Sequence, residues 1–245
     1  MKVLKPFIVE LAPTLSEHWY YVWRAQSDGL KGEYLGIFPS STTILTKYPQ
    51  SEELVKWIAR EGFHESRQIR DSAGKAGTKI HLACDALEKG EILLKENYSL
   101  EEWYKISTFI NWHKDYTPEI IAKEFPIFSE SGLYAGRPDR LYKIENAITL
   151  LDEKSSRSLS PHFPLQVASY AKAVEENTDL EIAQTAILQL GAKNNKGYRF
   201  ETYSNWRDHY RVFEHVYGVW KYAETDSNGK IKEPLVLELP DSLKL

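Results

Sequence analysis

The residues best suited to chemistry are Asp139, Asp152 and Lys154, which lie in one strand-rich stretch of the 245-residue chain. Side chains on a strand point alternately to its two faces, so Asp152 and Lys154 share a face and Glu153 points to the other. Asp139 falls on the preceding strand, within reach of that face. Two carboxylates beside one ammonium group are typical of a site for a divalent cation with a positive charge next to it.

A strand–turn–strand is the element that must position these groups. The first predicted strand covers 133–142, the second covers 147–155, and Glu145-Asn146 between them is a turn signal. Another strand is predicted over 119–128, directly before the hairpin. Acidic oxygens from neighbouring strands are therefore expected to gather in one place.

Further motifs lie on either side of the hairpin, in a fixed order along the chain. They are the histidine motif Gly77-Thr78-Lys79-Ile80-His81, the acidic residue Glu124, the G-x-x-D element Gly136-Arg137-Pro138-Asp139, the D-x-K element Asp152-Glu153-Lys154 and the Q-x-x-x-Y pair Gln166 and Tyr170. In this order they resemble the PD-(D/E)XK nuclease superfamily, and within it the RecB-like exonuclease group.

A second resemblance lies nearer the N-terminus. The stretch from Pro39 to Leu45 has the pattern P-S-x-T-x-I-L and leads into a predicted helix over 51–60 with a Leu-x-x-Trp pattern. This arrangement is similar to the mitochondrial genome maintenance exonucleases and their phage and bacterial relatives. The hydroxyls from Ser40 to Thr43 then either contact phosphates or only cap a turn.

The resemblance implies an α/β fold of the restriction-endonuclease-like type. Its mixed central sheet of about five strands is flanked by helices and carries an N-terminal elaboration. We expect one nuclease domain over 1–245. Its parts would be an N-terminal hairpin and helix over 1–62, a nuclease core over 63–225 and a C-terminal extension over 226–245.

The resemblance also assigns roles to individual residues. The expected catalytic groups are Asp139, Asp152, Lys154, Glu124 and His81. The expected metal ligands are Asp139, Asp152, Glu124, His81 and the backbone carbonyl of Glu153. Hard cations prefer oxygen ligands, so the expected cofactor is Mg²⁺ or Mn²⁺. The residues expected to contact DNA or to support the site are Gln166, Tyr170, Arg137, Ser41, Thr42 and Arg157, and further candidates for phosphate contacts are Arg140, Lys193, Lys196 and Arg199.

Composition limits the alternatives. The chain has a net charge of −4 and a pI of about 6.0, which suits an ordinary enzyme of small substrates unless a local basic groove binds phosphates. Its one cysteine, Cys84, excludes both an internal disulfide framework and a four-cysteine iron–sulfur cluster. No run of residues approaches membrane-spanning length and no targeting signal is evident, so a cytoplasmic protein is expected.

The function that these patterns favour is metal-dependent hydrolysis of DNA, by an exonuclease acting on single-stranded ends or flaps. The alternatives are a structure- or site-specific endonuclease of the same fold, a non-catalytic DNA-binding module and an RNA nuclease.

One further question concerns Trp19, Tyr21 and Trp23, which share a face of a predicted hairpin over 19–38. These rings either pack in the core or form a stacking platform for unpaired bases.

Overall fold

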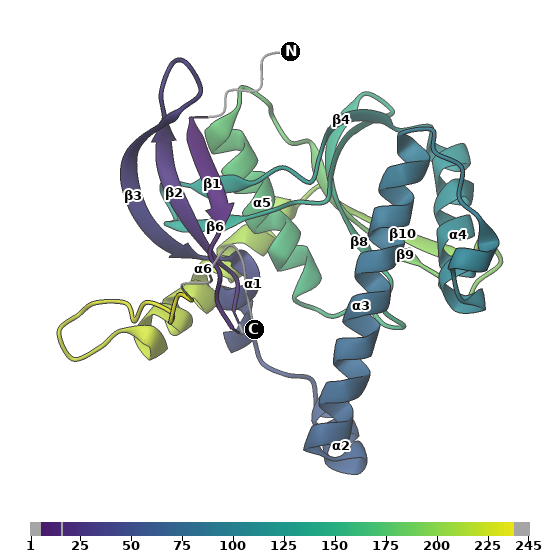
Figure 1. Ribbon diagram of the computed structural model, residues 1–245, viewed down its shortest axis with the longest axis horizontal. Coiled ribbons are helices and arrows are strands. Elements are labelled where there is room, and N and C mark those ends of the chain that lie inside the picture. The colour runs from purple at the N-terminus through teal and green to yellow at the C-terminus, as the bar shows by residue number, and fades with distance from the viewer. Residues whose placement is uncertain (1–5, 16, 238–245) are drawn as a thin grey trace, which may run out of the picture.

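The computed structural model describes residues 6–15 and 17–237, and its centre is a five-stranded sheet lying between two groups of helices (Figure 1). The strands are β1 (Phe7–Leu11), β2 (Trp19–Ala25), β3 (Lys31–Pro39), β4 (Glu119–Lys123), β5 (Ile127–Ser129), β6 (Tyr134–Gly136), β7 (Arg140–Ile144), β8 (Ala147–Lys154), β9 (Gln184–Leu190) and β10 (Tyr198–Tyr203). The helices are α1 (Ser41–Ile44), α2 (Glu52–Glu61), α3 (Phe63–Glu88), α4 (Leu100–Tyr116), α5 (Phe163–Asn177) and α6 (Trp206–Glu224). The last eight residues of the predicted 226–245 extension lie outside the described residues.

The central sheet has the strand order β10-β9-β8-β7-β4 and is mixed. Strands β8 and β9 are parallel, whereas the other neighbouring pairs are antiparallel. A parallel pair needs a crossover connection, and α5 supplies it between β8 and β9. The predicted α/β fold with a mixed sheet flanked by helices is therefore confirmed.

The two faces of the sheet bury different side chains. Along β8, Leu150 packs with residues of α5 and α6, and Leu151 packs with residues of α3 and α4. The alternation continues to the end of the strand, so Asp152 and Lys154 point to the α5 face and Glu153 points to the α3 face. The functional groups at the end of β8 are thus divided between two environments.

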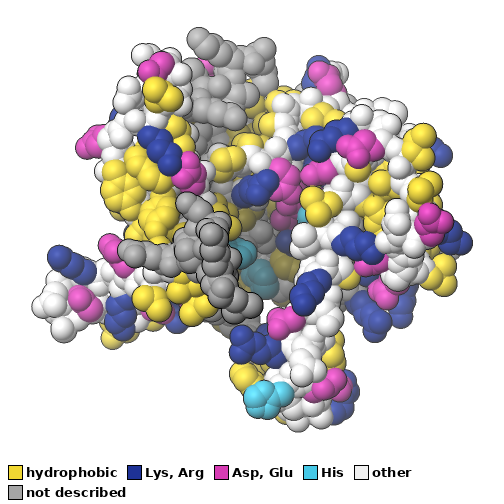
Figure 2. Space-filling model, viewed as in Figure 1, with side chains coloured by type: hydrophobic (Ala, Val, Ile, Leu, Met, Phe, Trp, Pro, Cys, Tyr) yellow, Lys and Arg dark blue, Asp and Glu magenta, His cyan; other side chains and the backbone are white. Residues whose placement is uncertain are grey.

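The N-terminal strands β1–β3 form a separate antiparallel sheet that packs on the small β5–β6 sheet, mainly through Val22, Phe128 and Ala135. The predicted hairpin over 19–38 is present, but its aromatic face is divided. Trp19 is buried against Trp220, while Tyr21 and Trp23 form an incompletely buried cluster with Tyr34. Hydrophobic side chains gather over this sheet on the face shown in Figure 2.

Two predicted strands are each interrupted in the structure. The strand predicted over 133–142 is split into β6 and β7 around Pro138, which lacks the N–H that a continuous ladder would need. Asp139 lies directly after the proline, at this interruption. The strand predicted over 119–128 is likewise split, because Glu124 adopts a left-handed backbone conformation with φ of 45°. Both interruptions place a carboxylate at a strand end.

The sequence predicts a helical pattern over 64–88 that is interrupted at Gly74 and Gly77, but helix α3 is continuous. Neither glycine has a positive φ, so neither ends the helix. At Gly77 a Cβ would lie 3.1 Å from Oγ of Ser155, the residue after β8. The glycine therefore lets α3 approach the end of β8 closely. Among the described residues, none of the helices has the length and apolar character that crossing a bilayer requires.

Candidate active site

The acid–amine pair Asp152 and Lys154 lies on the α5 face at the end of β8. Nζ of Lys154 is 2.6 Å from Oδ2 of Asp152, whose side chain is only 4% exposed. The Gln166 side chain lies between 3.1 and 3.4 Å from three partners: it accepts from Lys154 and donates to Asp152 and to the Tyr170 hydroxyl. The Q-x-x-x-Y pair on one face of α5 thus supports the acid–amine pair directly.

A glycine in the G-x-x-D element makes room for this support. A Cβ on Gly136 would lie 2.3 Å from Cε1 of Tyr170, so any larger residue would displace the tyrosine ring. Farther along the same helix, the Ser169 hydroxyl donates to the buried Ser41 hydroxyl over 2.8 Å. Ser41 therefore cannot contact DNA through its side chain without rearrangement, and its observed contact is with α5.

A second group of ligand atoms lies beside this pair. His81 of α3, Glu124 after β4 and Asp139 before β7 each offer one ligand atom, and the three atoms all lie within 4.8 Å of one another. Nδ1 of His81 is 3.8 Å from Oδ2 of Asp139. The backbone N–H of Glu153 donates to the same Oδ2 over 2.8 Å. Asp139 is therefore held against the strand that carries the acid–amine pair.

The carboxylates of this region disfavour one another's charge. Burial raises the pKa of Asp152 to about 6, although Lys154 opposes the shift and Asp139 adds to it. Burial also raises the pKa of Glu124, again with a contribution from Asp139. Burial alone would lower the pKa of His81, but the charges of Asp139 and other carboxylates outweigh it and raise that pKa. A bound cation would relieve this crowding of negative charge.

The donor atoms fit a divalent cation of the Mg²⁺ or Mn²⁺ type. Carboxylate oxygens suit both ions, and an imidazole nitrogen among them favours Mn²⁺. The cluster contains three of the predicted ligands, His81, Glu124 and Asp139. Asp152 lies outside this cluster and is engaged by Lys154, although it was predicted as a ligand too.

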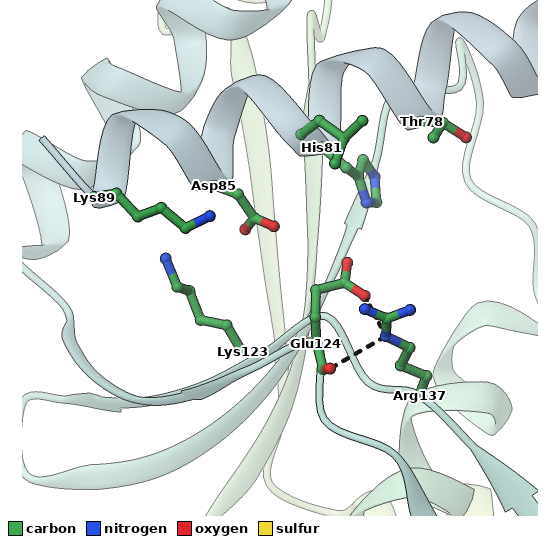
Figure 3. Close-up of a pocket in the computed structure, with 8 residues that line it drawn as sticks. Thr78, His81, Asp85, Lys89, Lys123, Glu124 and Arg137 are labelled. Carbon is green, nitrogen blue, oxygen red and sulfur yellow. Dashed lines mark hydrogen bonds and ion pairs between the residues drawn. The ribbon is translucent and has the colours of Figure 1, made fainter. Parts of the chain in front are cut away.

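A pocket of about 520 Å³ opens over this cluster (Figure 3). Its walls come from α3 on one side and from the end of β4 and the β6–β7 connection on the other. The lining residues are Thr78, His81, Leu82, Asp85, Lys89, Lys123, Glu124 and Arg137. Arg137 is half-exposed at the rim, where its Nε lies 2.8 Å from Oε2 of Glu124. The cluster is thus accessible to a ligand from outside.

The remaining predicted contacts with nucleic acid are spread over the surface. Thr42 is exposed at the start of α1, and Arg157 is exposed in the loop that follows β8. Lys196 pairs with Asp115, and Arg199 pairs with a glutamate on its own strand. Lys193 is exposed. On the face shown in Figure 2, basic and acidic side chains are interspersed over α3 rather than gathered into one basic field.

The expectation that Arg140 contacts phosphates is wrong, because its side chain is only 1% exposed. Its Nε lies 2.9 Å from Oε1 of Glu153 and 3.5 Å from Oε2 of Glu88, and its Nη1 pairs with Asp85. Sequence reasoning missed this buried network, which lies behind the candidate metal cluster. The available signal was the spacing of His81, Asp85 and Glu88, which places all three on one face of α3.

Replacing Arg140 with methionine should lower the free energy of unfolding by about 3–5 kcal/mol, because it leaves buried carboxylates without their cation. Urea unfolding at pH 7 measures this effect. Lys143→Met is the matched control, since Lys143 is 42% exposed on the same strand and should change stability by less than about 0.5 kcal/mol. Equal stability of the two variants would contradict the structural role of Arg140.

The raised pKa of Asp152 predicts a pH-dependent stability difference in metal-free protein. A carboxyl group whose pKa rises from 3.8 to about 6 on folding stabilises the fold at low pH, and this contribution is lost as the pH rises through that window. Asp152→Asn should therefore gain about 2 kcal/mol relative to the wild type between pH 4 and pH 7. Urea unfolding in chelator at several pH values checks this. A stability difference that does not change with pH would contradict it.

Comparison with protein-family models gave no match for this chain, and comparison with curated proteins gave none. The resemblance to PD-(D/E)XK nucleases therefore rests on the sequence motifs alone. The positions of the motif residues in the structure are a separate observation, and they decide which chemistry the site can support.

Proposed function

We propose that this protein is a divalent-metal-dependent nuclease that hydrolyses phosphodiester bonds of DNA. The observation that carries the proposal is the convergence of His81, Glu124 and Asp139, whose ligand atoms lie within 4.8 Å of one another. The backbone of Glu153 joins this cluster to the acid–amine pair, since its N–H donates to Asp139. Ligands for a hard cation and a neighbouring ammonium group are what hydrolysis of a phosphodiester requires.

The chain's own residues then have separate tasks. His81, Glu124 and Asp139 would hold Mg²⁺ or Mn²⁺, which when bound lowers the pKa of water and neutralises phosphate charge. Lys154 orients the attacking water and stabilises the negative charge that develops at phosphorus. Gln166 fixes the amine of Lys154 and the carboxylate of Asp152 through its two hydrogen bonds. Arg137 at the pocket rim is available to a phosphate oxygen.

The preference for DNA ends belongs to the same proposal, and its first support is the family resemblance. We propose exonucleolytic action on single-stranded ends or flaps. The half-exposed aromatic cluster around Trp23 carries Lys31, whose Nζ lies 3.9 Å from the centre of the Trp23 indole. Such a pairing of an aromatic face with a cation is suited to stacking of unpaired bases.

A digest of labelled nucleic acids tests the proposal. Linear and covalently closed single-stranded DNA, linear duplex DNA and a matched RNA are incubated with Mg²⁺, with Mn²⁺ or with chelator. We expect cleavage of linear single-stranded DNA with either metal, none with chelator, and survival of the closed circles. Cleavage of the circles would show an endonuclease instead, and preference for the RNA would show a ribonuclease. Absence of metal-dependent cleavage of every substrate would overturn the proposal.

A further inference from the structure

Two lysines project into the pocket at the end away from Arg137. Lys89 caps the C-terminal end of α3, and Lys123 is the last residue of β4. Their amines point toward each other across the pocket in Figure 3, with Asp85 beside them. Two ammonium groups that face each other repel, so a bound anion between them would be favourable.

The carboxylates nearby are already engaged by other partners. Lys123 lies 3.1 Å from Oε2 of Glu88, but that glutamate also contacts Arg140, His113 and Tyr142. Burial would raise the pKa of Glu88, yet these donors outweigh burial and lower the pKa to about 2. One buried carboxylate is therefore shared among several donors, and the charge of Lys123 is only partly offset.

The charge of Lys89 is not offset by a nearby carboxylate of the described chain either, although Asp85 lies close by in the pocket wall. The Asp85 carboxylate pairs with the buried guanidinium of Arg140, behind the pocket wall. Lys89 is exposed and forms no ion pair with any residue that the structure describes. This end of the pocket thus carries two ammonium groups and no carboxylate reserved for them.

The position of the lysines relates them to the candidate metal cluster. Lys123 directly precedes Glu124 in the chain, and Lys89 lies two helical turns beyond His81 on α3. The pocket is continuous between the cluster and the lysines. Two residues of the cluster, His81 and Glu124, line the same cavity as the two lysines. If the scissile phosphate of a nucleic-acid strand lies at the cluster, a neighbouring phosphate of that nucleic acid would therefore lie at this end of the pocket.

We propose that Lys89 and Lys123 form a subsite for a phosphate of the nucleic-acid backbone that adjoins the scissile one. The proposal rests on the nuclease function proposed above. A lysine amine is a compact cation with three donors, and two of them on opposite sides can bind different oxygens of one phosphate. The subsite sets the register of the strand on the metal cluster, and it reads backbone charge rather than base identity.

The first test removes one backbone charge at a time from a fluorescent single-stranded oligonucleotide. A neutral methylphosphonate replaces each linkage in turn, and cleavage and binding are both measured. At one position the neutral linkage should weaken the wild-type reaction about tenfold, as expected for loss of a charged hydrogen bond. In Lys89→Ala the same linkage should have a clearly smaller effect, and in Lys143→Ala, whose lysine lies outside the pocket, the full tenfold effect should remain.

The second test uses the salt dependence of binding without added metal, so it does not require cleavage. In the double variant Lys89→Ala/Lys123→Ala, the negative slope of log affinity against log salt concentration should become shallower by about 0.7. This is the change expected for loss of one phosphate contact on a single-stranded nucleic acid. The single variant Lys89→Ala is measured as well, because Lys123 also supports the buried Glu88 and its removal is expected to lower stability. A change in Lys89→Ala therefore reports on binding rather than on folding. An unchanged slope with an unchanged response to neutral linkages would overturn the subsite. Absence of cleavage by wild-type protein with a reduced slope would instead overturn the nuclease function alone.

Discussion

Lys154→Met should lower the rate of DNA cleavage by about 10²- to 10³-fold, while DNA binding changes little. The amine is the cation nearest to Asp152, at 2.6 Å, and its side chain is 18% exposed. It is further fixed by the Gln166 side chain and by the ring of Phe163, whose centre lies 4.5 Å from Nζ. A positioned positive charge of this kind acts on charge that develops during the reaction, so its loss affects rate more than affinity.

The measurement is single-turnover cleavage of a labelled oligonucleotide, with binding measured separately. Lys172→Met is the matched control on α5, because Lys172 is 36% exposed and, among the described residues, pairs only with Glu176 on the same helix. The control should cleave at the wild-type rate. Wild-type cleavage by purified Lys154→Met would remove this lysine from the chemistry.

Asp139→Asn should weaken Mn²⁺ binding by more than about a hundredfold, since even outer partners of metal ligands contribute 10- to 100-fold. Asparagine keeps an oxygen that can accept the hydrogen bond from the Glu153 N–H, so the local fold should persist. It removes the negative charge next to His81 and Glu124, whose ligand atoms share the cluster. Cleavage should be lost together with the metal.

Isothermal titration with Mn²⁺ measures this effect. Asp115→Asn serves as the control, because Asp115 lies at the surface in contact with Lys196 and is outside the cluster. Its Mn²⁺ affinity should equal that of the wild type. Tight Mn²⁺ binding by Asp139→Asn would mean that the ion lies elsewhere.

The sequence predicted the sheet and the local hairpin well, because strand alternation and turn residues are short-range signals. The turn at Glu145-Asn146 and the side-by-side arrangement of Asp152 and Lys154 both follow from them, whereas the α/β class was expected from the motif resemblance. Gly136 was visible only as part of a motif. Its physical reason, the close approach of the Tyr170 ring, depends on a helix that arrives from a later part of the chain.

Other features depend on long-range packing and were missed. Arginine is usually exposed, so nothing in its immediate neighbours indicated that Arg140 is buried among carboxylates of α3 and β8. Helix α3 also had to be recognised as continuous before His81 and Lys89 could be placed along one pocket. Glycines inside a helical pattern do not by themselves show whether a helix ends.

The division of the site between two faces is the second feature that only the structure provides. Asp152 and Lys154 lie on the α5 side of β8, while His81 approaches from α3 on the other side. Asp139 joins them because the interruption at Pro138 places it at the strand end, where the backbone of Glu153 binds its carboxylate. A pattern of alternating residues predicts faces, but it does not predict which helix crosses the end of a strand.

Anomalous scattering from crystals equilibrated with Mn²⁺ tests the central claim most directly. We predict a manganese peak at bonding distance from His81, Glu124 and Asp139, next to the pair formed by Asp152 and Lys154. The peak should be absent from crystals of Asp139→Asn grown in the same way. A protein that cleaves DNA with Mn²⁺ but binds the ion away from these three side chains would contradict the account.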